Sequence, residues 1–408
     1  MGKTYFNYFK IGWVNVQKKL DMKIILRYRQ ASKLKKVRAY GKAENAFQKI
    51  IASCKLDDYE IMSGAYFHLG EIYLAYKSKD KAQDYFSKAL SLNPMHKVAG
   101  QSLFNLYTSL PSFPLPFHLY IDVSKGCNLS CIYCPEGQKV NEQPKRSMRI
   151  GDYKKLVGPL LHNLKRVDFM NWSEPLLNND LFKIIQYSLS VKPDLKIDFA
   201  TNGMLLSESI SELLIDSGVH GVSVSISGLT NSIYQRYHVG GDIAKVLKNI
   251  KYFLQLKSER GSKSYPFLYI NYLEFNYNKI DLDCLYRSIY KSLGMNNFQV
   301  LKNSGSLMGS TLERGYRGKR YRKRIGFEKV TYIKNECFRA FSTFVIRCDG
   351  TIFPCCALHY DSKYIVGDLK KQTLEEAWNS KRWKDFRETF KRGTNSICNS
   401  CRFYSSDY

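Results

Sequence analysis

Three cysteines, Cys127, Cys131 and Cys134, stand within eight residues in a C-x3-C-x2-C spacing. Cysteine thiolates are the common protein ligands of iron–sulfur clusters, and three of them can hold three irons of one cubane. The fourth iron then has no protein ligand and is open to a small molecule. An apolar, β-prone run over residues 117–123 leads into this loop, so the cysteines are expected to follow a strand. Tyr133, just before the third cysteine, would shield such a cluster from water.

A structural zinc site is the alternative for this loop. Zinc favours four ligands in a closed tetrahedral geometry, and no fourth Cys or His lies close by in the sequence. The ligand spacing therefore favours an iron–sulfur cluster.

Cys337, Cys355, Cys398 and Cys401 form a second set near the end of the chain. Four cysteines that close with a C-x2-C pair can hold either zinc or an iron–sulfur cluster. Within this set, Asp349-Gly350 indicates a hairpin turn between short strands.

The four remaining cysteines are expected to be buried thiols that serve packing; they are Cys54, Cys284, Cys348 and Cys356. Two of them, Cys348 and Cys356, flank members of the second set. Either could replace Cys355 as a ligand or donate a hydrogen atom to a radical.

Strand-like and helical stretches alternate after the first cysteine loop, which is typical of an α/β fold with a parallel sheet. The candidate strands are residues 166–170, 196–200, 221–226, 267–273 and 297–301, and the candidate helices include 179–190, 207–217 and 243–256. With the strand before the cysteines they make six βα units. Function in parallel barrels is found at the C-terminal ends of the strands.

The composition is that of a globular protein with an excess of basic residues. The chain has 408 residues, 44% of them hydrophobic, and a formal net charge of +27. Such a charge favours anionic partners, such as nucleic acid, a membrane surface or phosphorylated substrates. The basic residues concentrate in 1–40 and 312–324. The alternative to an anionic partner is that these stretches form a solvated surface.

Neither a signal peptide nor an apolar run of about eighteen residues is found, so no transmembrane helix is expected. The cysteines have metal-like spacings, which predicts a location in the reducing cytoplasm. Residues 1–38 place apolar residues among lysines at helical spacing. That pattern predicts either a helix packed on its neighbours or weak contact with a membrane surface.

Residues 65–94 resemble a tetratricopeptide repeat, with Gly70, Ala82 and Phe86 at positions where two antiparallel helices approach closely. Prolines at 111–116 then indicate a linker. We predict three domains: a basic, repeat-like helical domain over 1–110, a catalytic core over 115–310, and a C-terminal cysteine domain with the basic loop over 311–408. The helical domain would either bind peptide segments or serve as a structural cap.

The first cysteine loop resembles the signature of the radical S-adenosylmethionine (radical SAM) superfamily, including the aromatic residue before the third cysteine. The resemblance implies a partial (βα)6 barrel of TIM type. It also implies a [4Fe–4S] cluster that chelates SAM, and a reductant such as flavodoxin or ferredoxin.

The same resemblance carries over to several strand ends. Glu174 stands at the Glu position of the family's Gly-Gly-Glu-Pro motif and would accept the SAM ammonium, although Trp172-Ser173 replace the glycines. Asn202 would lie near the nucleoside and Ser225 near the SAM carboxylate or ribose. Arg236 or His238 would meet the carboxylate; which of the two does so stays open.

Two further positions near these strand ends bear on the same resemblance. Ser227 stands where an Asp is more usual, and Asn278 matches a recurrent Asn of the family.

The C-terminal set resembles the SPASM domain, or its shorter twitch form, of many radical SAM enzymes. It implies one auxiliary [4Fe–4S] cluster on Cys337, Cys355, Cys398 and Cys401, and it favours iron–sulfur over zinc.

The chain is thus expected to be a radical SAM enzyme that abstracts a hydrogen atom, and a peptide or protein is the preferred substrate. A dehydrogenase or epimerase of a sugar or nucleotide-linked small molecule is the first alternative. A non-catalytic RNA- or protein-binding scaffold is the second. The reaction that follows hydrogen abstraction, the individual substrate, the role of the basic stretches and the oligomeric state stay open.

Overall fold

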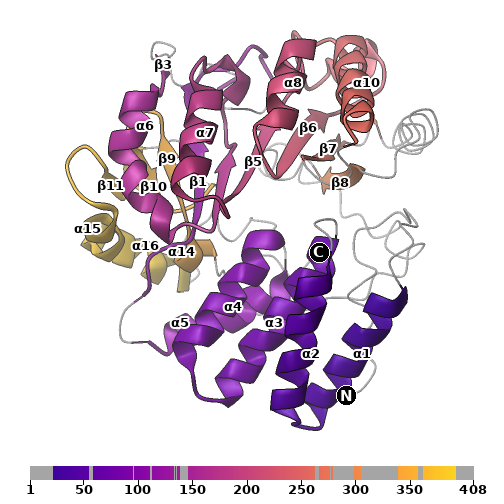
Figure 1. The fold of residues 1–408 in the computed structure, drawn as a ribbon. Helices are drawn as coiled ribbons and strands as arrows, with labels where there is room; N and C mark the ends of the chain where they lie inside the picture. Colours follow the sequence, from indigo (N-terminus) through magenta and orange to yellow (C-terminus); the bar gives the residue numbers. More distant parts are fainter. Residues whose placement is uncertain are drawn as a thin grey trace.

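The structure is a computed structural model, and it describes residues 22–54, 58–94, 96–110, 113–132, 134, 136–137, 146–261, 266–275, 277–278, 298–304, 339–356 and 362–391. The predictions for Tyr133, Cys284, Cys337, Cys398, Cys401 and the basic run 312–324 lie outside these residues, as does most of the basic N-terminal stretch. Figure 1 shows a layer of N-terminal helices below an α/β body that carries the sheet.

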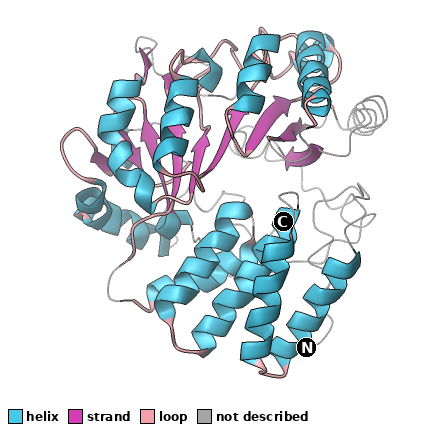
Figure 2. Ribbon diagram, viewed as in Figure 1, coloured by secondary structure: helices cyan, strands magenta, loops and turns pink. Residues whose placement is uncertain are grey.

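Within the described residues, five helices form the N-terminal layer, and each packs on the next along the chain (Figures 1 and 2). They are α1 (Met22–Lys36), α2 (Tyr40–Ser53), α3 (Tyr59–Ala75), α4 (Lys79–Leu92) and α5 (Lys97–Thr108). The helix pair expected over 65–94 corresponds to α3 and α4. That these helices are of the tetratricopeptide type stays a prediction.

Small residues let α3 and α4 approach closely, as the sequence pattern predicts. A Cβ atom at Gly70 would lie 2.5 Å from the Phe86 ring, so only glycine fits under this ring. Ala82 and Phe86 are fully buried in the same cluster. The contact fixes the hairpin because a larger side chain at position 70 would force the helices apart.

Six parallel strands form the main part of the sheet. They are β1 (His118–Asp122), β4 (Arg166–Phe169), β5 (Lys196–Thr201), β6 (Gly221–Ile226), β7 (Phe267–Glu274) and β8 (Phe298–Ser304), and they lie side by side in that order. Their order and direction confirm the predicted partial barrel. The predicted strand positions match these strands to within a few residues.

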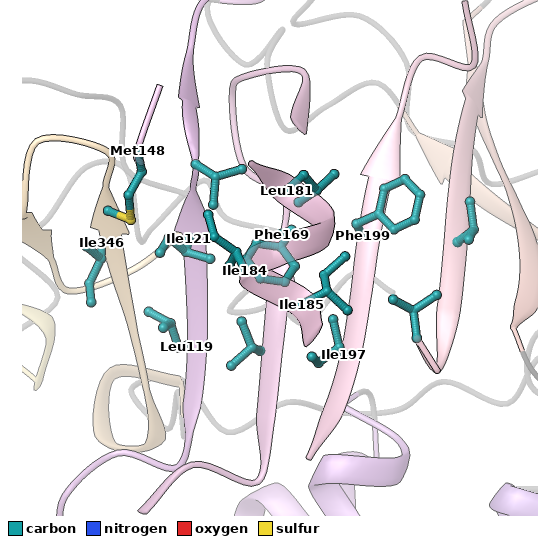
Figure 3. Packing of buried hydrophobic residues seen from close by; sticks show 14 of the residues in the cluster. Leu119, Ile121, Met148, Phe169, Leu181, Ile184, Ile185, Ile197, Phe199 and Ile346 are labelled. Carbon is teal, nitrogen blue, oxygen red and sulfur yellow. The ribbon is translucent and has the colours of Figure 1, made fainter. Parts of the chain in front are cut away.

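Helices cover one face of the sheet, as Figures 1 and 2 show. They include α6 (Ile150–Leu156), α7 (Leu181–Val191), α8 (Glu208–Asp216) and α10 (Ile243–Glu259). Alternate strand residues such as Ile121, Phe169 and Phe199 pack against these helices in the main core (Figure 3). The intervening side chains point to the other face of the sheet because side chains alternate along a strand.

At β6 and β7 the other face is more polar and only half-buried. Ser223, Ser225 and Asn271 alternate with fully buried Val222, Val224 and Ile270, and all three polar residues are half-buried. Ser225 pairs in register with Asn271 on the neighbouring strand. Small polar side chains thus line the part of this face nearest the C-terminal strand ends.

The C-terminal segment joins the same sheet. After α14 (Arg339–Ser342), β9 (Thr343–Arg347) pairs with β1 as a parallel strand. Its five residues lie opposite His118 to Asp122 in order. β10 (Thr351–Phe353) and β11 (Gly367–Asp368) continue the sheet antiparallel, and α15 (Leu374–Asn379) and α16 (Lys381–Lys391) follow. The predicted hairpin at Asp349-Gly350 is confirmed, with Gly350 at φ 90°.

The helical layer and the barrel meet through charged groups. Lys165 donates to Asp84 of α4 at 2.8 Å, and Arg166 donates to the backbone oxygen of Ser91 at 3.1 Å. Tyr59 of α3 also contacts Phe267 of β7, with ring centroids 5.5 Å apart. None of the helices in the described ranges is long and apolar enough to cross a membrane.

Candidate functional site

The first cysteine loop leaves the sheet at the C-terminal end of β1. Residues Ser124–Lys125 (β2) pair with Arg146–Ser147 (β3), and Gly126 then turns the chain at φ 115° into Cys127. The Gly126 carbonyl accepts a hydrogen bond from the Glu174 N–H at 3.2 Å. The loop is thereby tied to the segment that follows β4, as expected for residues gathered at one end of a parallel sheet.

The three cysteines of the loop share one apolar cluster with Leu129 and Tyr237. Cys131 is buried, whereas Cys127 and Cys134 are half-buried. Backbone bonds hold the loop against the segment after β6: the Ser130 N–H donates to Val239 O at 2.9 Å and the Ile132 N–H to Tyr237 O at 3.2 Å. The predicted ligands of one cluster are therefore brought together.

The loop fits an iron–sulfur cluster. No group of three or more His, Cys, Asp or Glu side chains in the described ranges is arranged to hold a single metal ion. A cubane needs no such arrangement because each cysteine binds a different iron. Burial raises the pKa of the Cys127 thiol to about 11 and also raises the pKa values of Cys131 and Cys134. Iron ligation supplies the positive charge that makes the buried thiolates favourable.

Glu174 lies directly beside this loop and is 2% exposed. Its carboxylate accepts hydrogen bonds from the Leu176 N–H at 3.2 Å, the Thr201 hydroxyl at 2.8 Å and the Asn202 N–H at 2.9 Å. Burial raises its pKa to about 7, and these three donors oppose the rise. A carboxylate has about four acceptor positions, so one is left for a cation such as the predicted SAM ammonium.

Asn202 follows β5 and connects Glu174 to the cysteines. Its side-chain nitrogen lies 2.7 Å from Asn128 Oδ1 and 3.6 Å from Cys127 Sγ. Its own Oδ1 accepts from the Met204 N–H at 3.0 Å. The structure thus places Asn202 beside the cluster loop, and its position near a nucleoside stays a prediction.

Ser225 and Asn278 lie near the ends of β6 and β7. Ser225 is half-buried on the face of the sheet opposite the helices. Asn278 is fully buried; it donates to Ser227 O and Leu273 O, both at 2.8 Å, and accepts from the Phe275 N–H at 2.6 Å. These three bonds make Asn278 a brace between two strand ends.

Arg236 and His238, the two candidates for the SAM carboxylate, have different surroundings. His238 is buried, its Nδ1 lies 2.6 Å from the Ser227 hydroxyl, and its ring stacks on Tyr234 at 4.5 Å. Burial lowers the pKa of His238 to about 3, so the ring is neutral near pH 7. Arg236 is exposed, and its guanidinium lies 3.8 Å from the centre of the Tyr277 ring. Arg236 is thus the candidate with a positive charge.

Asp122 at the end of β1 organises the substituted motif, and the sequence analysis overlooked it. One carboxylate oxygen accepts from the Trp172 and Ser173 N–H groups, both at 3.2 Å, and from the Ser173 hydroxyl at 2.8 Å. Ser173 thus gains a side-chain bond that a glycine at this position would lack. A buried polar residue at a strand end, inside an otherwise apolar run, was the available signal.

The second cysteine set is described only in part. Cys355 and Cys356 follow β10 and are both half-buried, whereas Cys348 is buried in the main core beside the helices. Arg387 supplies a further observation: one of its guanidinium nitrogens, Nη2, is buried with no hydrogen-bond partner among the described residues. Arg387 lies over the Trp378 ring at 4.1 Å and over Phe341, which packs in the same cluster as Cys355. Arg387 therefore lies over an aromatic residue of the apolar cluster against which Cys355 packs.

Comparison with known families assigns both cysteine regions. Residues 121–273 match the radical SAM superfamily, and residues 337–402 match the SPASM iron–sulfur cluster-binding domain. The radical SAM domain implies a [4Fe–4S] cluster and SAM, and the SPASM domain implies auxiliary iron–sulfur coordination.

The chain is similar over part of its length to curated proteins named GTP 3′,8-cyclase or probable GTP 3′,8-cyclase. It is 32% identical over 142 residues to the GTP 3′,8-cyclase of Clostridium botulinum (strain Okra / Type B1), covering 34% of this chain and 44% of that protein. It is 34% identical over 132 residues to a probable GTP 3′,8-cyclase of Methanococcus maripaludis (strain C5 / ATCC BAA-1333), covering 32% and 43%. The chain therefore spans less than half the length of these relatives.

Among solved structures, SuiB of Streptococcus suis bound to the precursor peptide SuiA has a similar fold. The two share 17% identity with a TM-score of 0.53, and the match covers 84% of this chain and 87% of SuiB. This likeness confirms the fold.

Proposed function

We propose that this chain, which carries a radical SAM domain followed by a SPASM domain, is an enzyme that abstracts a hydrogen atom from a peptide or protein. When bound, the cluster and SAM together supply a 5′-deoxyadenosyl radical that can attack an unactivated C–H bond. The rest of the proposal concerns what the residues of this chain contribute.

The residues at the strand ends would bind SAM and keep water away. Cys127, Cys131 and Cys134 would hold the cluster within the apolar cluster that Leu129 and Tyr237 complete. Glu174 would accept the ammonium through its remaining acceptor position, and Arg236 would offer the positive charge for the carboxylate. Ser225, half-buried on the face of the sheet opposite the helices, would donate to the ribose or the carboxylate.

The observation that carries the peptide proposal is a row of tyrosines on the helical layer. Tyr66, Tyr85, Tyr73, Tyr76 and Tyr40, here the tyrosine ladder, contact one another in that order. The successive ring centroids are 6.2, 5.2, 5.8 and 5.9 Å apart. None of the five is buried, and Tyr76 is 45% exposed.

Charged side chains of both signs lie along the tyrosine ladder, since Lys88 pairs with Asp84 at 2.7 Å and the Tyr73 hydroxyl donates to Glu44 at 2.6 Å. Lys81 sits 5.0 Å from the Tyr73 ring and Lys88 sits 5.2 Å from the Tyr85 ring. Tyrosines give large contact area at low entropic cost, with a hydroxyl that can still bond to water or a backbone. Lys81, which forms no ion pair among the described residues, would favour an acidic partner and increase its association rate. The surface therefore suits an extended acidic peptide with apolar side chains.

A nucleotide-linked small molecule is the second candidate. It is supported by the partial similarity to proteins named GTP 3′,8-cyclase and by the basic run 312–324. A dehydrogenase or epimerase of such a molecule would use the same radical chemistry. A non-catalytic scaffold would leave the cysteine loop, Glu174 and Asn202 assembled at the same edge of the sheet without a purpose.

Point changes in the full chain test the peptide proposal better than removal of residues 1–110, because Asp84 and Ser91 of α4 bond to the barrel. We expect the paired change Tyr76→Ser and Tyr85→Ser to weaken binding of a labelled acidic synthetic peptide containing Leu and Tyr by at least about tenfold. Peptide binding should also weaken as salt rises. SAM cleavage without substrate should stay unchanged.

Tyr252→Ser, a tyrosine on α10 of the barrel, is the matched control and should leave peptide binding unaltered. GTP is the competing probe. Turnover stimulated by GTP and not by peptides, equal in the native chain and the paired tyrosine variant, would contradict the peptide proposal in favour of the nucleotide one. SAM cleavage absent from the reduced native protein would favour the scaffold.

A further inference from the structure

Two hairpin turns of the helical layer are built alike. Arg38, between α1 and α2, has φ 59°, and Lys77, between α3 and α4, has φ 60°. Among the described residues, no other residue except glycine has a positive φ. Their N–H groups donate to Lys35 O and Leu74 O, both at 3.0 Å, and the next N–H in each turn closes a second bond, at 3.0 and 2.9 Å. The two turns are therefore one helix-ending motif used twice.

The matching turns belong to matching hairpins. The spacing between Arg38 and Lys77 also separates Phe47 from Phe86, and both phenylalanines are fully buried. Where α2 and α4 end, at the other end of the layer, the cap residues have extended backbone instead. The left-handed turn is thus confined to one end of the layer and repeated there.

A basic residue is an unusual choice for this backbone conformation. Glycine usually occupies the position, because a Cβ atom is strained at positive φ. Arg38 and Lys77 are both exposed, and neither forms an ion pair among the described residues. A basic side chain at a helix end offsets part of the strain through the helix dipole. A bound anion is the other interaction that would favour it at both turns.

The tyrosine ladder connects the two turns. Tyr40 follows the first turn, Tyr76 directly precedes Lys77, and the two ring centroids are 5.9 Å apart. Val37, next to Arg38, is 74% exposed, and Tyr76 is 45% exposed. The two cations therefore lie beside exposed apolar groups at one end of the ladder.

Basic side chains predominate around these turns. Asp80 is exposed in the first turn of α4, and Glu44 already accepts the Tyr73 hydroxyl. The exposed basic residues within 36–42 and 77–81 are Lys36, Arg38, Lys42, Lys77, Lys79 and Lys81. This end of the layer therefore suits a partner that carries carboxylates.

We propose that Arg38 and Lys77 bind the carboxylates at one end of an acidic peptide that lies along the tyrosine ladder. This inference rests on the proposed function and adds to it which end of the ladder takes the charge. The backbone bonds of the tight turns hold both cations in place relative to Tyr40 and Tyr76. Charges fixed in this way set the register of a bound partner as well as its association rate.

The test is equilibrium binding of two labelled synthetic peptides to the full chain at low salt. One peptide contains Leu, Tyr and glutamates at both ends, and the other has glutamine in place of each glutamate. Arg38→Gly together with Lys77→Gly should weaken binding of the glutamate peptide by about fivefold and leave the glutamine peptide unchanged. Arg27→Gln together with Lys49→Gln, which removes the same charge from exposed positions of α1 and α2 away from the turns, is the control and should change neither.

Stability separates binding from a role in the helix ends. Since glycine suits positive φ, the urea midpoint of the glycine pair should equal the native one or exceed it. A lower midpoint with unchanged peptide binding would assign both residues to the helix dipole and overturn the inference. So would an equal loss of affinity for both peptides. Arg38→Lys with Lys77→Arg keeps both charges and should retain native binding, and a clear loss there overturns the inference as well.

The proposed function and this inference fail in different ways. A native chain that binds neither peptide, or binding that Tyr76→Ser with Tyr85→Ser leaves unchanged, overturns both. Binding that the tyrosine pair weakens and the glycine pair does not overturns this inference alone. A single-stranded RNA of the same length is the further probe. If it binds more tightly than the glutamate peptide and the glycine pair abolishes its binding, the two cations serve a nucleic acid and the assignment to a peptide is wrong.

Discussion

Glu174 carries a carboxylate that the fold buries and supplies with hydrogen bonds at the same time. Burial raises its pKa to about 7, far above the ordinary value for glutamic acid. Between the ordinary value and about 7, the native state holds a proton that the unfolded chain has released. The free energy of unfolding contributed by this group therefore falls as pH rises through that window.

Binding of SAM should show the opposite trend, because an ammonium group pairs only with the ionised carboxylate. We expect the affinity of the reconstituted protein for SAM to rise by about tenfold per pH unit below pH 7 and to level off above it. Glu174→Gln should remove this pH dependence and weaken binding near pH 8 by about ten- to a hundredfold. Equilibrium binding of SAM at several pH values measures both effects.

Asp180→Asn is the control for Glu174→Gln, because Asp180 is another carboxylate of the same segment. Its backbone N–H bonds to Asn178. Affinity that is unchanged in Glu174→Gln would mean that Glu174 braces Thr201 and Asn202 without contacting SAM.

The three cysteines of the first loop permit a second test at this scale. Changing Cys127, Cys131 and Cys134 together to Ala should remove about half of the iron and all SAM cleavage, because each thiolate holds one iron of the SAM-binding cluster. Iron analysis and product chromatography on anaerobically purified protein measure the two losses. Zinc in place of iron in the native protein would contradict the cluster assignment.

At the residue scale, the sequence predicts which residues form the site better than it predicts which groups surround them. The cysteine spacing and the positions of Glu174 and Asn202 follow from motif order, and the structure brings these residues together. Neither the three donors to Glu174 nor the burial of His238 beside Ser227 can be predicted this way. Both depend on segments that meet only after the strands have aligned.

The strands and helices also differ in how far the sequence predicts them. The six parallel strands and their helices are predictable because buried parallel strands are short apolar runs separated by amphipathic helices. The pairing of β9 with β1 is not, since it joins His118 to Thr343, more than two hundred positions apart, with nothing local to signal it. This pairing places the hairpin that carries Cys355 directly beside the strand that leads to Cys127.

That arrangement predicts different effects for the two cysteine sets. Changing Cys398 and Cys401 together to Ala should spare SAM cleavage in the absence of substrate but abolish substrate turnover. The reason is that, among the described residues, Glu174 and Asn202 make their hydrogen bonds within the first loop and the segments after β4 and β5. The measurement compares 5′-deoxyadenosine formed with and without substrate. A folded double variant that no longer cleaves SAM would show that the auxiliary cluster serves the first cluster directly.

Across the whole molecule, a buried network of charges joins the helical layer to the base of the barrel. Arg166 forms ion pairs with Asp168, at 2.7 Å, and with Asp198, and it also bonds to Ser91 O in α4. His118 lies 2.8 Å from Asp168, and His220 lies 2.9 Å from Asp198. Burial would lower the pKa of Arg166, but the two carboxylates raise it above its ordinary value.

Removing this arginine should destabilise the molecule as a whole rather than the site. Arg166→Met leaves two buried carboxylates without their shared cation, and breaking a buried pair in this way costs about 3–5 kcal/mol. It also removes the bond that ties α4 to β4. Urea unfolding, followed by tryptophan fluorescence for the barrel and by far-ultraviolet circular dichroism for the helices, should show a lower midpoint for both signals. Lys183→Met, which removes an exposed pair with Asp180, is the control and should change stability by less than about 1 kcal/mol. An unchanged midpoint in Arg166→Met would mean that apolar contacts such as Tyr59 with Phe267 hold the two layers together instead.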